Sequence, residues 1–196
     1  ESDDPLVRHF AAKSLGDAQT KSPDAINKLK SLTRDGNPGV RAMAACALWS
    51  CTRSEADVLP VLVSSLDDEP SPIVLRYYTV PSASFMGQHL FVIGCLGEMA
   101  RDSEAARAVL QRIVRRELPV RCKWNDMIQS LISAWGMAQY GTRKYLDAII
   151  AIVEHEHDPL RPEALKLMGP GKLDEWKRQL AHERSWCKIG CARDKK

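Results

Sequence analysis

The sequence lacks most of the features that mark membrane proteins and familiar enzymes. No apolar run approaches the roughly 20 residues that a membrane-spanning helix needs, and Glu1–Asp4 is acidic where a signal peptide is basic. There is no glycine-rich phosphate loop, no Gly-x-Ser-x-Gly elbow and no convincing Cys/His nucleophile pair. We therefore expect a cytoplasmic protein with no membrane partner, and export is the alternative because the chain does not begin with Met.

Net charge is also scarce, and it is unevenly distributed. The 196 residues carry a net charge of +3, but the segment from Lys172 to Lys196 holds eight Lys/Arg against four Asp/Glu. The preceding 171 residues then carry a net charge of −1. Residues 1–171 therefore lack the positive charge that binding to nucleic-acid phosphates favours. The C-terminal tail, residues 183–196, is basic.

What the sequence does contain is a repeat. Asp35–Trp49 matches Asp4–Gly16 at a Pro, Val-Arg, Ala-Ala and Leu, with a constant shift of 33 residues. Such self-similarity is typical of a solenoid, in which each unit buries its apolar face against its neighbours. We read each unit as an outer helix A and an inner helix B. The pattern predicts an all-α solenoid of antiparallel helix pairs, with about four to five repeats in one domain over residues 1–182.

The spacing of helix signals supports this register. A Ser or Thr, the preferred N-cap residues, follows a matched apolar position of each B helix (Leu15, Leu48, Leu96 and Trp135) by six or seven positions. These predicted caps of the A helices are Ser22, Ser54, Ser103 and Thr142. Gly16 is predicted to end the first B helix, because glycine tolerates a positive φ. Since no A helix precedes this B helix, we expect the natural protein to continue upstream of Glu1.

The period is broken once, by fifteen residues inserted at about 70–86. Insertions in repeat arrays normally leave through a loop and often mark the binding side. The alternative is a surface excursion without a function. The insertion's candidate partner contacts are Arg76, Tyr77, Tyr78 and Phe85.

The repeated residues resemble the HEAT repeat superfamily over about residues 3–170, and in particular the short bacterial repeats of phycobilisome lyases. The resemblance implies a right-handed superhelix whose B helices line a concave, protein-binding surface. It also implies a ladder of polar contacts between an Asp in the A–B turn and an Arg in helix B. Asp35 with Arg41 fits this ladder best, whereas Arg8 and Arg161 keep only the Arg half.

We predict a non-catalytic scaffold, without cofactor or metal, that binds another protein on its concave face or insertion. Outside the insertion the candidate contacts are Trp49, Trp124 and Gln129. Trp49 stands where a glycine usually ends the helix, which would put a large aromatic near the concave rim; core packing is the alternative.

Two other functions stay open. A nucleic-acid-binding module would use the basic tail and a local cluster beside Trp124 that consists of Arg112, Arg115, Arg116, Arg121 and Lys123. A repeat-fold enzyme or lyase subunit is the second alternative.

The His and Cys residues of the sequence do not match the ligand sets of known iron and zinc sites. Deoxyhypusine hydroxylase resembles this repeat but binds iron through His-Glu pairs, and here His9 and His89 are followed by Phe and Leu. Cys187 and Cys191 with His182 lack the fourth ligand of structural zinc, so free thiols or a disulfide are alternatives.

Overall fold

The computed structural model describes residues 2–71, 88–179 and 181, and these contain helices and turns but no strand. The named helices are α1 (Pro5–Asp17), α2 (Pro23–Leu32), α3 (Pro38–Thr52), α4 (Glu55–Ser65), α6 (His89–Met99), α7 (Glu104–Val114), α8 (Trp124–Tyr140), α9 (Tyr145–Glu154) and α10 (Arg161–Met168). Residues 173–179 are also helical.

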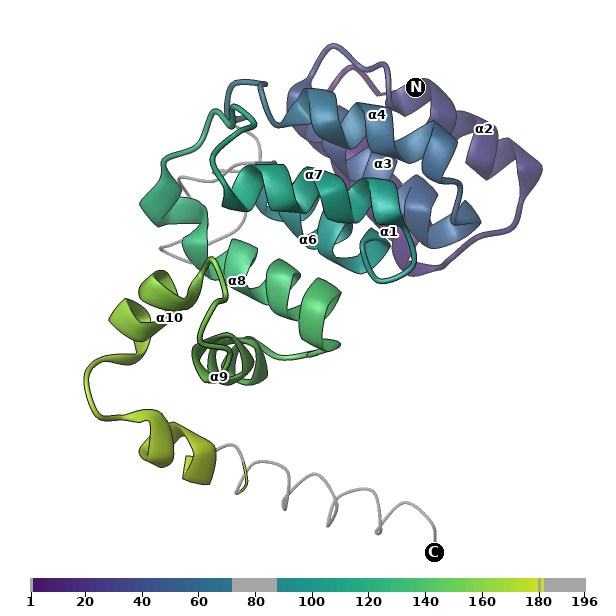
Figure 1. Cartoon of the computed structure of the whole chain (residues 1–196). Coiled ribbons are helices and arrows are strands. Elements are labelled where there is room, and N and C mark those ends of the chain that lie inside the picture. Colours follow the sequence, from purple (N-terminus) through teal and green to yellow (C-terminus); the bar gives the residue numbers. More distant parts are fainter. Residues whose placement is uncertain (1, 72–87, 180, 182–196) are drawn as a thin grey trace, which may run out of the picture.

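The helices form two layers, as the repeat register predicts. The B helices α1, α3, α6 and α8 pack in this order, each on the next, and the A helices α2, α4, α7 and α9 each pack on the B helices before and after them in the chain. Figure 1 shows α4 and α7 lying in front of α3 and α6. The core is made mainly by aliphatic and Ala residues of the B helices, together with the apolar faces of the A helices. The fold is therefore an all-α, HEAT-like solenoid.

The predicted helix starts are mostly confirmed. The predicted cap Ser103 accepts a backbone N–H group with its hydroxyl at 2.9 Å, and at the start of α1 the Asp4 carboxylate does the same at 2.8 Å. Ser22 and Ser54 occupy N-cap positions without a capping hydrogen bond from their side chains. The prediction for Thr142 is wrong: α8 ends at Tyr140, the Thr142 N–H bonds to the Gly136 carbonyl as part of this helix end, and Lys144 is the N-cap of α9.

The prediction that Gly16 ends its helix is also wrong. Gly16 lies inside α1 and is not among the glycines with positive φ. A Cβ at Gly16 would stand 2.8 Å from both Cα and Cβ of Ala47 in α3, and one at Gly97 would stand 2.7 Å from the same atoms of Ala134 in α8. The repeated glycine is therefore needed for close approach of neighbouring B helices, not for a turn.

Trp49 occupies this glycine position in α3, and its expected exposure at the concave rim is wrong. Its side chain is only 5% exposed, and the Arg53 guanidinium carbon lies 5.1 Å from the ring centroid. The reason is that α3 does not end at Trp49 but continues to Thr52, and α1, α2, α4 and α6 all pack against it. Trp49 is therefore core packing, the alternative that the sequence left open.

The two ends of the predicted insertion meet. The Ser71 N–H donates to Oε1 of Gln88 at 2.8 Å, and Nε2 of Gln88 donates to the Glu69 carbonyl at 2.9 Å. Ser71 and Gln88 are fully buried. Because the chain leaves and returns at one point, the repeat register resumes at α6. The insertion's candidate contacts, Arg76, Tyr77, Tyr78 and Phe85, lie outside the described residues.

Candidate functional site

A ladder of ion pairs joins the first three repeat units. Nε and Nη2 of Arg8 contact the two carboxylate oxygens of Asp35 at 2.7 and 2.9 Å, and Nη2 of Arg41 contacts the Asp68 carboxylate at 2.7 Å. The predicted ladder is confirmed, but the pairing differs from the expected one. Each Arg side chain contacts the Asp carboxylate of the following unit. Within its own unit, Arg41 contacts Asp35 through the backbone carbonyl of that residue, at 2.8 Å, and not through its carboxylate.

These contacts favour a structural role for the ladder. Asp35 is largely buried, with a side chain 8% exposed, and the bidentate bond from Arg8 lowers its pKa below the usual range. The remaining donors of Arg8 bond the carbonyls of the turn that precedes α1. Little of either side chain is left for a ligand.

The ladder stops in the later units. The position of Arg8 is held by His89 in α6 and by Ile128 in α8, 81 and 120 residues further on. A ring nitrogen of His89 lies 3.1 Å from the Leu66 carbonyl oxygen, so this residue still joins neighbouring segments. Ile128 offers no polar group. In α10 the Arg returns as Arg161, which donates to the Val153 carbonyl at 3.0 Å instead of to a carboxylate.

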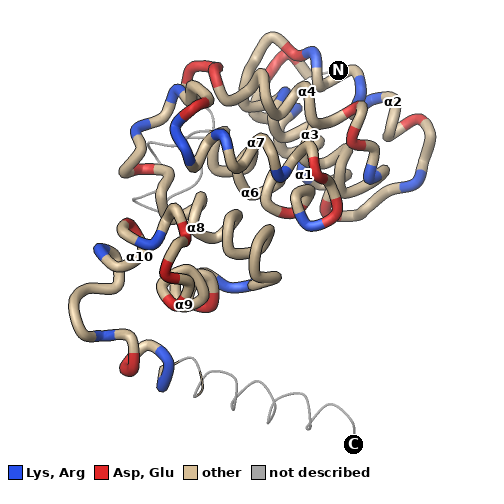
Figure 2. Tube along the Cα trace, in the orientation of Figure 1, with Lys and Arg blue, Asp and Glu red and all other residues tan. Residues whose placement is uncertain are grey.

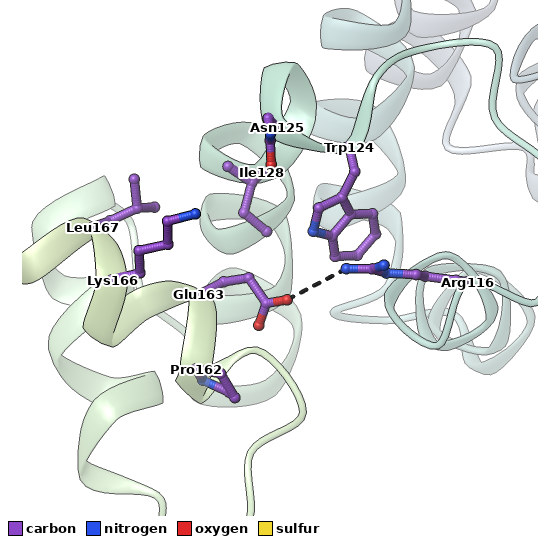
Figure 3. A pocket seen from close by; sticks show the side chains of 8 residues that line it. All are labelled: Arg116, Trp124, Asn125, Ile128, Pro162, Glu163, Lys166 and Leu167. Atoms are coloured by element: carbon purple, nitrogen blue, oxygen red, sulfur yellow. Dashed lines mark ion pairs between the residues drawn. The ribbon is translucent and has the colours of Figure 1, made fainter.

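A groove of about 400 Å³ opens where the Arg is lost, between α8 and α10. Helix α10 packs mainly on α9, which leaves this space beside α8 uncovered. Apolar parts of Trp124, Ile128 and Leu167 line the groove, and charged groups stand around it (Figure 3). The full lining comprises Arg116, Trp124, Asn125, Ile128, Pro162, Glu163, Lys166 and Leu167.

Arg116 and Trp124 form the centre of this groove. Arg116 follows α7 in the left-handed conformation, with φ of 60°, and its guanidinium carbon lies 4.3 Å from the Trp124 ring centroid. One Arg116 nitrogen stands 3.7 Å from the Glu163 carboxylate. The Trp124 Nε1 is buried and makes no hydrogen bond within the described residues, and Figure 3 shows it on the side of the ring that faces Glu163 and Ile128. An apolar groove thus contains an unused N–H donor.

A buried network fixes the α10 wall of the groove. Asp158, in the turn before α10, accepts a hydrogen bond from Nε1 of Trp135 at 2.9 Å and one from the Leu160 N–H at 2.8 Å. The Tyr140 hydroxyl donates to the same carboxylate, and burial together with this contact raises the pKa of Tyr140. The network ties the turn before α10 to the C-terminal half of α8.

Comparison with known proteins identifies the repeats. Residues 1–77 match the family profile of HEAT repeats. The first repeat units of the chain therefore belong to the HEAT repeat superfamily. The matched segment contains both Arg–Asp pairs of the ladder, which are thus features of the HEAT units themselves. No curated protein and no solved structure matches the chain significantly, and the phycobilisome-lyase subtype stays a prediction.

Some of the groove residues were predicted from the sequence, and others were not. Trp124 is a predicted protein contact and Arg116 belongs to the basic cluster predicted beside it, and the structure stacks their side chains. Gln129 is exposed on α8 but does not line the groove. Glu163 and Lys166 on α10 were missed, although the loss of the HEAT arginine at Ile128 was a signal that the unit junction differs there.

The basic cluster of the nucleic-acid alternative is partly neutralised. Arg121 pairs with Glu69 and, at 3.4 Å, with Asp67, and Arg116 faces Glu163. Figure 2 shows basic and acidic segments side by side along these turns. The other members, Arg112, Arg115 and Lys123, are exposed and form no ion pair with another described residue.

His9 and His89, which stand where deoxyhypusine hydroxylase has iron-binding His-Glu pairs, each have a ring nitrogen near a backbone carbonyl oxygen. A ring nitrogen of His9 lies 3.0 Å from the Gly39 carbonyl oxygen, and burial lowers the pKa of His9. Within the described part of the chain, no three His, Cys, Asp or Glu side chains gather closely enough for a metal ion. His182, Cys187 and Cys191 lie outside that part. No helix in the described ranges has the length and apolarity to cross a membrane.

Proposed function

We propose that this HEAT-repeat chain is a non-catalytic scaffold that binds another protein, with the groove between α8 and α10 as its principal contact. The observation that carries the proposal is the combination of an open apolar groove with a buried, unbonded Trp124 N–H. Trp49 Nε1 and Ser65 Oγ are also buried without a hydrogen bond in the described residues, but neither residue lines this groove. A junction that leaves apolar surface and a donor unused is a place where a partner gains free energy by binding.

The residue types in the groove support protein recognition. Trp and Arg are over-represented among the residues that dominate the binding free energy of protein interfaces. Trp124 presents its ring with Arg116 stacked above it, and charged groups surround the apolar floor as in an interface rim. We propose that Gln129 and the insertion residues Arg76, Tyr77, Tyr78 and Phe85 add further contacts with the partner.

Site-specific cross-linking in the organism that makes the chain tests this function. A photo-reactive amino acid replaces Asn125, which is exposed and lines the groove, or Ala108, which is exposed on α7 outside it. We expect a defined protein to be captured at Asn125 and not at Ala108. Absence of any protein adduct, or turnover of a substrate that is lost when the polar groove residues are replaced, contradicts the proposal.

A nucleic-acid-binding module is the second candidate, because Arg112, Arg115 and Lys123 are exposed cations without an acidic partner in the described residues. If all three contact phosphates, the logarithm of the binding constant should fall against the logarithm of salt concentration with a slope of about −2 to −3. No binding to duplex or single-stranded nucleic acid at about 50 mM salt removes this candidate.

A further inference from the structure

We infer that the groove between α8 and α10 binds an acidic peptide segment that carries one apolar anchor side chain. This inference rests on the proposed protein-binding function and names the chemistry of the partner. The anchor would lie over Ile128 and Leu167. A carboxylate would face Arg116 and Lys166, and a carbonyl or carboxylate oxygen would accept the Trp124 N–H.

The charges around the groove favour an acidic ligand. Two cations, Arg116 and Lys166, and one carboxylate, Glu163, line it. The chain neighbours carry both signs, Arg115 and Lys123 against Glu117 and Asp126, so the net positive charge of the lining itself carries this argument. A partner segment with negative charge is therefore attracted, and one with positive charge is repelled.

The state of Arg116 shows that its charge is available. Its nearest contact with Glu163 is 3.7 Å, beyond hydrogen-bond range, and its side chain is 64% exposed. Arg8, by contrast, makes two carboxylate bonds of 2.7 and 2.9 Å. An exposed, long-range pair contributes little to stability, whereas a guanidinium can bind a planar carboxylate through two parallel bonds. A partner carboxylate can thus replace Glu163 at small cost.

The unbonded donor adds a second constraint. A buried N–H without an acceptor is unfavourable, and a ligand that supplies an oxygen atom removes that penalty. Lys and Arg side chains carry donors only, so they cannot bond the Trp124 Nε1 group. The volume of about 400 Å³ is at the small end of ligand pockets, which suits an anchor side chain of an extended segment better than a folded domain surface.

The test compares two short peptides with the same central Leu, one flanked by Glu residues and the other by Lys residues. Binding to the full chain is measured by fluorescence anisotropy of the labelled peptide. We expect the acidic peptide to bind at least about 10-fold more tightly, and Arg116→Gln to weaken it by about 5- to 20-fold. Glu163→Gln removes the competing carboxylate and should tighten binding by about 2- to 5-fold. The matched control Arg112→Gln lies outside the groove and should change affinity less than about 2-fold.

The Trp124 donor has its own readout. In an amide-correlation NMR spectrum the indole N–H resonance that disappears in Trp124→Phe belongs to this residue. Addition of the acidic peptide should move that resonance downfield, as expected for a newly formed hydrogen bond. Trp124→Phe retains an aromatic ring and should weaken the acidic peptide by about 3- to 10-fold, the effect of one lost hydrogen bond.

Several results would overturn the inference. One is tighter binding of the Lys peptide than of the Glu peptide, and another is binding of neither peptide. Weaker binding of the acidic peptide to Glu163→Gln is a third. The fourth is displacement of the acidic peptide by nucleic acid whose affinity falls equally in Arg112→Gln and Arg116→Gln. Self-association at the groove that the acidic peptide does not displace would assign the site to a second copy of the chain. If cross-linking at Asn125 still captures a protein, the scaffold function survives these failures; without capture, the function itself fails.

Discussion

The same substitution, Gly→Ala, should have opposite effects at the two glycines of α6. A Cβ at Gly97 would stand 2.7 Å from Cα and Cβ of Ala134 in α8. A Cβ at Gly94, three residues earlier in the same helix, would meet no heavy atom within 4 Å. The two variants therefore share local sequence and helix, and they differ in whether the neighbouring B helix is in the way.

The magnitudes follow from two competing terms. Replacing a glycine inside a helix by alanine stabilises the folded state by about 0.5–1 kcal/mol, because the unfolded chain loses freedom. Gly94→Ala should show this gain. At Gly97 the overpacking cost is about 1–3 kcal/mol, and we expect its upper part because the obstructing atoms include backbone Cα. Gly97→Ala should therefore lose about 1–2 kcal/mol, so the two variants should differ by about 2–3 kcal/mol.

Urea unfolding followed by far-ultraviolet circular dichroism measures the difference, provided that the urea dependence of the unfolding free energy is unchanged. Thermal midpoints should move in the same directions, by about 2–4 °C per kcal/mol. Gly16→Ala, whose Cβ would stand 2.8 Å from Ala47, should behave like Gly97→Ala. Equal or greater stability of Gly97→Ala relative to Gly94→Ala would refute the role of these glycines in helix approach.

Three further predictions concern the polar contacts and a thiol. Because Arg8 lowers the pKa of Asp35, its stabilisation is present above the ordinary Asp pKa of about 4 and is lost as pH falls through the lower folded-state pKa. Asp35→Asn should thus lower the free energy of unfolding by about 1–2 kcal/mol at neutral pH. In this variant the urea midpoint should also fall less steeply as pH is lowered. Asp158→Ala leaves the buried Trp135 N–H unbonded and should lose about 2–4 kcal/mol in urea unfolding, with faster proteolysis before α10. Burial raises the pKa of Cys122 to about 11, so iodoacetamide should alkylate it at pH 8 about 100-fold more slowly than in the unfolded chain.

Each of these has a clear contrary result. An unchanged acid limb in Asp35→Asn would mean that the Arg8 pair contributes no pH-dependent stability. Wild-type stability of Asp158→Ala would show that the network does not hold α10. An alkylation rate of Cys122 that fails to rise about tenfold per pH unit would contradict control by its thiolate fraction.

The groove shows why sequence reasoning stopped short of the site. Trp124 and Arg116 are close in sequence and were noticed because aromatic and basic residues cluster there. Glu163 and Lys166 belong to another repeat unit, and only the packing of α10 on α9 brings them opposite α8. The sequence did hold one sign, because Ile128 breaks the arginine register, but a lost motif residue does not say what fills the space.

The repeat period by itself determined the helix order, the two-layer architecture and the place of the insertion, because apolar residues recurring at one spacing can be buried only by stacking like units. The family resemblance added Asp35, Arg8 and Arg41 as ladder residues, but not Asp68. Tertiary structure decided which carboxylate each arginine meets, why Gly16 is a glycine and where Trp49 lies. These depend on distances between helices, which a periodic pattern leaves open, and the groove at Trp124 exists because two neighbouring helices fail to close on each other.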